Sequence, residues 1–136
     1  DSMIEAIRNY LGKPELPIGD VINCVYHSLA KAYDDAVKVI EEISNKNIDV
    51  INIVGGGCKD TYLNSLTEKI TGKKVIAGPV EATALGNIIL QLIALGEIES
   101  VSEGRKIIAE TEKVKTFRSE HTPDWDEAFE RFCKIH

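Results

Sequence analysis

The chain has 136 residues, 43% of them hydrophobic and 28% charged, a composition typical of one folded domain with a sizeable core. Its formal net charge of -6, with basic residues scattered among acids, excludes a phosphate-binding groove for nucleic acid. Three widely spaced cysteines without a CxxC pair predict neither a disulfide framework nor a zinc site, and they favour the reducing cytoplasm.

The N-terminal residues predict a short helix followed by a linker. Ser2 and Glu5 have the spacing of a capping box, and the apolar residues after Ser2 form one stripe until Gly12. Pro14 and Pro17 then disfavour helix in the segment that contains them.

The strongest periodic signal predicts a long helix from Ile18 to Ile43, ended by residues 44–47. Apolar residues recur in steps of three and four along it, so we expect one apolar face packed against a sheet. We expect a scaffold role rather than chemistry for this helix. The apolar positions are Ile18, Ile22, Val25, Leu29, Ala32, Tyr33, Ala36, Ile40 and Ile43.

A glycine-rich junction follows. The apolar run of residues 50–54 predicts a strand, Gly55, Gly56 and Gly57 a tight loop, and residues 59–71 a helix. Glycine permits positive φ and close approach of a ligand, while a helix N-terminus offers unpaired N–H groups to an anion. The same pattern also fits a plain packing turn, because it lacks a Walker lysine and a dinucleotide fingerprint.

A second strand and a third helix follow the junction. Residues 75–77 predict a short strand, Gly78 and Pro79 a turn, and residues 80–95 a helix closed by Gly96. Gly86 lies in the middle of that helix, where we expect it to permit close backbone packing. The apolar run of residues 88–95 is too short to span a bilayer, so no membrane partner is expected.

The last third of the chain has weaker signals. Ser102 is a candidate cap of a short helix, and residues 112–118 are a candidate extended edge. Thr122 is the predicted cap of a last helix with an apolar aromatic face. That face consists of Trp125, Phe129 and Phe132. His27, His121 and His136 share no metal-ligand spacing with acids or cysteines, so no metal site is expected.

The alternation of helices and strands predicts an α/β fold with a short, mostly parallel sheet flanked by helices. Two segments then show a resemblance to a known family. Residues 55–67, which read GGGCKDTYLNSLT, and residues 75–87, which read VIAGPVEATALGN, resemble the C-terminal domain of the FGGY carbohydrate kinases. The wording of the second segment is most similar to the rhamnulokinase branch.

The resemblance implies a partial actin-like ATPase (ribonuclease H-like) domain and transfer of the γ-phosphoryl group of ATP, with Mg²⁺, to a sugar hydroxyl of L-rhamnulose. It implies that the glycine loop, Gly55 to Gly57 with Cys58, lies against the adenosine, and that Asp60 lies beside the base or ribose. Members usually carry asparagine there. A carboxylate accepts but does not donate hydrogen bonds, so Asp60 is either a nucleotide contact or only a helix N-cap.

The resemblance also implies that residues 1–136 are the C-terminal nucleotide-binding portion of a longer kinase, without its N-terminal domain and the start of this domain. The catalytic base, the Mg²⁺ ligands and the sugar contacts would lie in the missing part. An exposed sheet edge follows, through which the chain could form a homo-oligomer. The alternatives are a stand-alone nucleotide-binding or interaction module, and a kinase for xylulose, fuculose or glycerol.

Overall fold

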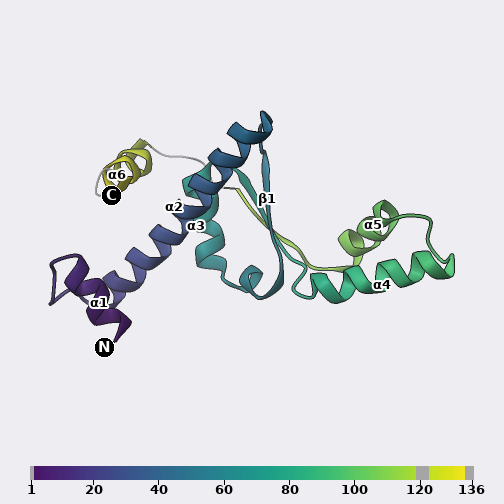
Figure 1. Ribbon diagram of the computed structural model, residues 1–136, viewed down its shortest axis with the longest axis horizontal. Coiled ribbons are helices and arrows are strands. Elements are labelled where there is room, and N and C mark those ends of the chain that lie inside the picture. The colour runs from purple at the N-terminus through teal and green to yellow at the C-terminus, as the bar shows by residue number, and fades with distance from the viewer. Residues whose placement is uncertain (1, 119–122, 134–136) are drawn as a thin grey trace.

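The computed structural model describes residues 2–118 and 123–133. Figure 1 shows the elements in chain order, with the α2 and α3 helices beside a small sheet and the α4 and α5 helices on its other side. The elements are α1 (Met3–Tyr10), α2 (Ile18–Ser44), β1 (Val50–Ile53), the 3-10 helix η1 (Gly55–Lys59), α3 (Thr61–Thr71), β2 (Lys74–Ala77), α4 (Ala82–Leu95), α5 (Val101–Thr111), β3 (Lys115–Phe117) and α6 (Pro123–Cys133).

The sheet of the described residues is three-stranded and mixed, in the order β1-β2-β3. β1 pairs with β2 in parallel, with Ile51 opposite Val75, and β2 pairs with β3 antiparallel, with Val75 opposite Phe117. The α3 helix covers the side of the sheet on which Val75 and Ala77 are buried. The predicted α/β class, the two predicted strands and the extended edge within residues 112–118 are therefore confirmed.

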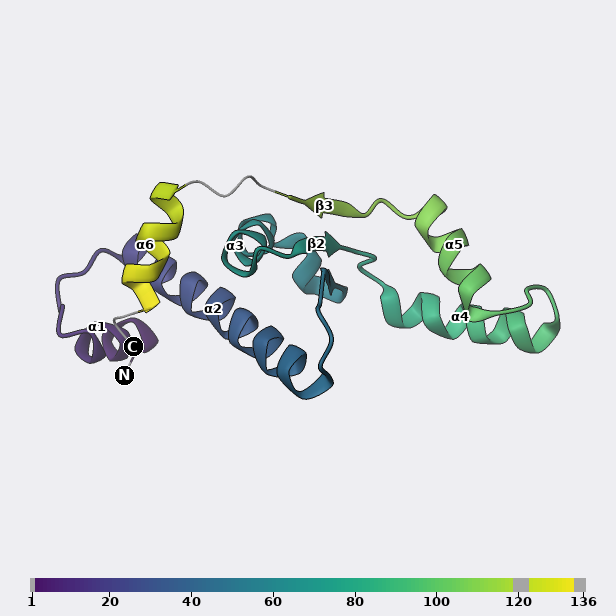
Figure 2. The same ribbon diagram turned by 90° about the horizontal axis from the view of Figure 1, so that it is seen from above.

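The core lies between α2 and α3, which pack along each other (Figure 2). Its buried centre consists of Ala30 from α2 with Leu66 and Ile70 from α3, and Tyr26 and Leu63 pack partly buried against it. This packing holds the start of α3 in place, directly after the glycine segment.

The predicted capping box is confirmed. The Ser2 N–H donates to Glu5 Oε2 at 3.2 Å, and the Glu5 N–H donates to Ser2 Oγ at 3.2 Å. The linker after α1 is closed by the Arg8 side chain, whose Nε donates to the carbonyl of Leu16 at 2.8 Å. The capping pattern and the prolines at this end of the chain therefore predicted the short helix and its linker correctly.

The prediction for the buried face of α2 was wrong. Among the described residues, the α2 helix packs mainly against α3 and also contacts α1, and its buried residues are Val21, Ala30, Asp34 and Val37. Most large residues of the predicted apolar stripe are exposed instead, Ile43 by 81%. Periodicity identified the helix correctly, but the side that is buried depends on which partner element is present.

Two further expectations need correction. The cap of α5 is Ser100 rather than Ser102, because the Ser100 Oγ accepts from the Glu103 N–H at 3.3 Å. A Cβ atom at Gly86 would meet nothing within 4 Å among the described residues, so close packing does not explain that glycine. The predicted cap Thr122 lies outside the described residues, as do the side chains of Trp125, Phe129 and Phe132.

Gly104 of α5 lies directly against Ile89 of α4. A Cβ atom there would lie 2.8 Å from three side-chain atoms of the buried Ile89. We expect Gly104→Ala to lower the free energy of unfolding by about 1–2 kcal/mol, because the crowded core must shift. Gly86→Ala, in open space within α4, should raise it by about 0.5–1 kcal/mol. Urea unfolding of both variants tests this pair, and an equally stabilising Gly104→Ala would contradict the described packing.

Candidate functional site

The glycine segment begins where β1 ends. Gly55 has φ +76°, a conformation that L side chains rarely adopt, so the backbone requires glycine there. Its N–H donates to the carbonyl of Pro79 at 3.2 Å, and the Gly78 N–H donates to the carbonyl of Ile53 at 2.8 Å. These bonds join the carboxyl ends of the parallel strands β1 and β2, the place at which α/β sheets bind ligands.

The other two glycines are not required by the surrounding structure. A Cβ atom at Gly56 would meet nothing within 4 Å among the described residues, and one at Gly57 would make only an ordinary contact of 3.7 Å with Ile53. Neither residue has positive φ. The structure therefore leaves an exposed backbone without side chains at Gly56 and Gly57, where a ligand can approach closely.

Asp60 is the N-cap of α3. Its Oδ1 accepts from the Leu63 N–H at 3.0 Å, and its Oδ2 accepts from the Tyr26 hydroxyl of α2 at 2.8 Å. The Leu63 N–H and the Tyr26 hydroxyl hold the pKa of Asp60 below its ordinary value, and the same bond to Asp60 raises the pKa of Tyr26. Asp60 therefore ties the end of the glycine segment to α2.

The rings of Tyr26 and Tyr62 extend this connection. Their centroids lie 5.2 Å apart at an interplanar angle of 67°, an edge-to-face contact. The Tyr62 hydroxyl donates to Oδ1 of Asn23 at 3.3 Å, one turn before Tyr26 on α2. Tyr62 of α3 is thus held against α2 by both its ring and its hydroxyl. The sequence analysis did not identify this role of Tyr26, Tyr62 and Asn23.

Cys58 lies within the same segment, but its side chain is buried. Its carbonyl accepts from Nδ2 of the buried Asn64 at 3.1 Å, and its thiol is free. Any contribution of Cys58 to a surface ligand therefore comes from its backbone. The structure brings the predicted residues together in one turn, and among them only Gly56 and Gly57 are exposed; these residues are Gly55, Gly56, Gly57, Cys58 and Asp60.

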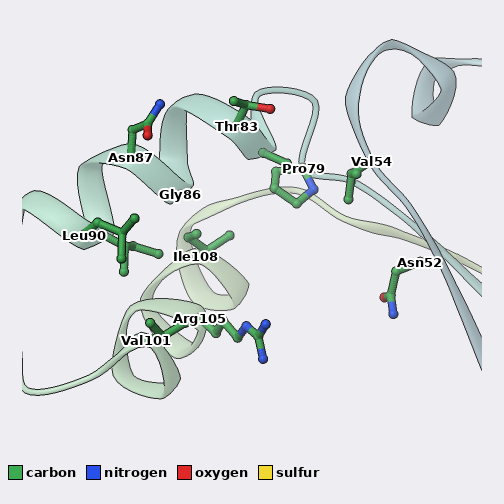
Figure 3. Close-up of a pocket in the computed structure, with 13 residues that line it drawn as sticks. Asn52, Val54, Pro79, Thr83, Gly86, Asn87, Leu90, Val101, Arg105 and Ile108 are labelled. Carbon is green, nitrogen blue, oxygen red and sulfur yellow. The ribbon is translucent and has the colours of Figure 1, made fainter.

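A cavity of about 850 Å³ adjoins this turn. The cavity lies between the ends of β1 and β2, the first turns of α4 and one side of α5. Its volume is within the range of small-molecule sites. In Figure 3, Arg105 extends from α5 toward the side on which Asn52 of β1 lies. The residues named in that view are Asn52, Val54, Pro79, Thr83, Gly86, Asn87, Leu90, Val101, Arg105 and Ile108.

The cavity lining does not include the predicted glycines, Cys58 or Asp60. The structure thus places the predicted residues beside the cavity rather than inside it. The sequence analysis missed the polar residues of this cavity, which are Asn52, Thr83, Asn87 and Arg105. Only two weak signals in the sequence pointed to the cavity. Asn52 interrupts an apolar strand, and Gly86 is a glycine in the middle of a helix without a packing role.

The stability of the chain should depend on pH through two carboxylates. Lys73 Nζ and the Ile48 N–H each donate to Glu41 Oε1 at 2.7 Å and hold the pKa of Glu41 below its ordinary value of 4.5, and that of Asp60 is held below 3.8. A lowered carboxyl pKa stabilises the fold above the unfolded pKa, and this stabilisation is lost as the pH falls through the folded pKa.

We therefore expect urea unfolding to show a loss of stability below about pH 4.5. The double variant Asp60→Asn and Glu41→Gln should be less stable than the wild-type chain at pH 7 but should lose less of its stability between pH 7 and pH 3. An equal loss in both proteins would show that these carboxylates do not carry the acid dependence.

Comparisons with known proteins identify relatives. The family described as the FGGY family of carbohydrate kinases, C-terminal domain, matches residues 2–95. The chain is 46% identical over 123 residues to the rhamnulokinase of Halalkalibacterium halodurans, and the aligned segment covers 87% of this chain and 26% of the relative. It is 37% identical over 121 residues to the rhamnulokinase of Bacillus subtilis, covering 86% of this chain and 25% of the relative.

The rhamnulokinase of Bacteroides thetaiotaomicron is 32% identical over 134 residues, covering 96% of this chain and 28% of the relative. The chain thus spans about a quarter of the length of the curated relatives it matches. Within the described ranges 2–118 and 123–133, none of the helices combines the length and apolarity needed to cross a membrane.

Proposed function

Because the chain belongs to the FGGY family of carbohydrate kinases, we propose that it is the nucleotide-binding portion of a longer sugar kinase that phosphorylates L-rhamnulose with ATP. The observation that carries this proposal is the match to relatives named rhamnulokinase along 86–96% of the chain. The C-terminal domain of the family has the actin-like ATPase fold, in which the small mixed sheet and its helices form one part.

In this proposal the glycine segment receives the adenosine of ATP or ADP. Gly56 and Gly57 let the base or ribose lie directly on the backbone, and Gly55 provides the turn that presents them. Asp60 holds the segment against α2 through its bonds to Leu63 and Tyr26, and Cys58 contributes through its backbone. Bound ATP supplies the γ-phosphoryl group for transfer.

The remaining catalytic groups are assigned outside this chain. Among the residues that the structure describes, no three His, Cys, Asp or Glu side chains gather to hold a metal ion, and we assign no Mg²⁺ ligand to them. Phosphoryl transfer also needs a base aligned on the sugar hydroxyl. We place the base, the Mg²⁺ ligands and the sugar pocket in an N-terminal domain and in the preceding part of this domain.

We also propose the cytoplasm as the compartment of the complete enzyme. Cys24 and Cys58 are both free thiols in the structure. Free thiols are maintained in a reducing compartment, whereas oxidising compartments favour disulfides.

A hybrid protein tests the nucleotide-binding role. In this hybrid kinase, the present chain replaces the matching segment of the rhamnulokinase of Halalkalibacterium halodurans, to which it is 46% identical. We expect the hybrid kinase to phosphorylate L-rhamnulose with ATP, measured as ADP release, because the chain supplies a working adenosine side of the cleft. The parent enzyme is the positive control, and the parent without that segment is the negative control.

A folded hybrid kinase that binds L-rhamnulose but neither binds ADP nor releases it would contradict the proposal. Nucleotide binding by the isolated 136-residue chain, with an affinity equal to that of the hybrid, would instead favour a stand-alone nucleotide-binding module.

A further inference from the structure

The α2 helix has a large apolar surface that the described structure leaves in water. Six large apolar side chains recur at intervals of three, four or seven residues, which places them along one side of the helix. Each is between 41% and 81% exposed. We call this surface the α2 apolar face, and it consists of Ile18, Ile22, Leu29, Tyr33, Ile40 and Ile43.

The α2 apolar face differs from the side of α2 that is already packed. The packed side contacts α3 through Tyr26 and Ala30, and it also carries the buried Asp34 and Val37. The α1 helix also packs against α2, and Leu29 lines a groove between these two helices. The contacts with α3 therefore use the side with smaller and more polar residues, whereas each residue of the α2 apolar face stays at least 41% exposed. A continuous apolar stripe of this kind on a helix indicates a partner surface.

A second unpartnered feature lies near one end of this face. Within the described residues, β1 pairs only with β2, so the other edge of β1 presents unpaired backbone N–H and C=O groups. Residues 45–49 are all that separates the end of α2 from β1, and Figure 1 shows β1 beside the C-terminal end of α2. A partner that covers Ile40 and Ile43 therefore lies within reach of the β1 edge.

We infer that the α2 apolar face is a docking surface for the polypeptide that precedes this chain in the complete kinase. The inference rests on the proposed function for the existence of that polypeptide. Its support is the length of the relatives, because the matched segment is only 26% of the Halalkalibacterium halodurans enzyme and the rest must join this portion somewhere. The α2 apolar face and the open β1 edge are two neighbouring surfaces of this portion that such a junction would cover.

Two matched proteins test the inference. The double variant Ile22→Gln and Ile40→Gln is made in the 136-residue chain and in the hybrid kinase. Glutamine keeps the helix propensity and removes the apolar surface. The control is Glu42→Gln, an exposed residue on another side of the same helix. Thermal unfolding is measured for these four variants and their two parents, together with the mass of the isolated chain by sedimentation.

In the isolated chain we expect the double variant to shift Tm by no more than about 2 °C, because both residues are exposed there. In the hybrid kinase we expect it to lower Tm by at least about 5 °C relative to Glu42→Gln, because two buried contacts are lost. Equal, small shifts in both proteins would overturn the inference. A dimeric isolated chain that the double variant makes monomeric would assign the face to a second copy and would also overturn it.

Cysteine labelling gives an answer even if the isolated chain lacks a cooperative transition. In the folded hybrid kinase, Ile40→Cys should react with a maleimide at least about tenfold more slowly than Glu42→Cys, because a covered thiol is inaccessible. Equal labelling rates would overturn the inference. None of these measurements uses kinase activity, so a hybrid that folds without phosphorylating L-rhamnulose would contradict the proposed function while leaving the docking result intact.

Discussion

Gly56→Val should weaken ADP binding by the hybrid kinase at least about tenfold while leaving its Tm unchanged within about 2 °C. The described structure gives Gly56 an exposed backbone in ordinary φ space, with nothing within 4 Å of an added Cβ atom. The side chain is therefore compatible with the fold and occupies only the space in which the adenosine is proposed to lie. Calorimetry with ADP and thermal unfolding measure the two effects separately.

Two glycines serve as controls for this variant. Gly19→Val, on α2, also adds a side chain in open space and should change neither affinity nor Tm appreciably. Gly55→Ala should behave oppositely, lowering the free energy of unfolding by about 1–2 kcal/mol because its φ of +76° is left-handed. Unchanged ADP affinity in a folded Gly56→Val hybrid would mean that the glycine segment is only a turn.

Asp60→Ala should lower the free energy of unfolding of the chain by about 1–2 kcal/mol. The change removes the cap that accepts from the Leu63 N–H and leaves the Tyr26 hydroxyl without its acceptor. Asp60→Asn should recover most of this loss, because the amide oxygen can accept one of the two bonds. Urea unfolding at pH 7 gives the comparison.

The same variants separate capping from nucleotide contact at this position. If Asp60 acts only by holding the glycine segment, Tyr26→Phe should weaken ADP binding in the hybrid kinase in proportion to the small loss of stability it causes. A direct contact would instead show as a loss of ADP affinity in Asp60→Ala that is much larger than the loss in Tyr26→Phe and larger than the difference in their Tm values explains. That outcome would restore Asp60 to the set of nucleotide contacts.

The local signals of the sequence predicted most elements correctly, including the turn that the glycine segment forms. The capping box at Ser2, the apolar runs that became β1 and β2, and the glycine junction depend on neighbouring residues only, so they could be identified without a fold. The Asp60 cap was among the alternatives because its spacing to the next helix is local as well.

Tertiary partners decided what the sequence could not. Periodicity marks an apolar side of α2 but does not say which element covers it, and here α3 packs against a different side. Arg105 and Asn52 meet at one cavity only because α5 returns to the ends of the strands. The Tyr26 bond to Asp60 joins residues 34 positions apart, a separation at which pattern reasoning has no signal.

Purification of the native polypeptide from its source cells, with an antibody to this chain, tests most directly whether the chain is the nucleotide-binding portion of a longer sugar kinase. We expect a polypeptide several times larger than 15.0 kDa that phosphorylates L-rhamnulose with ATP in preference to xylulose, fuculose and glycerol. A polypeptide of 15.0 kDa that binds a nucleotide without phosphorylating any sugar would contradict it.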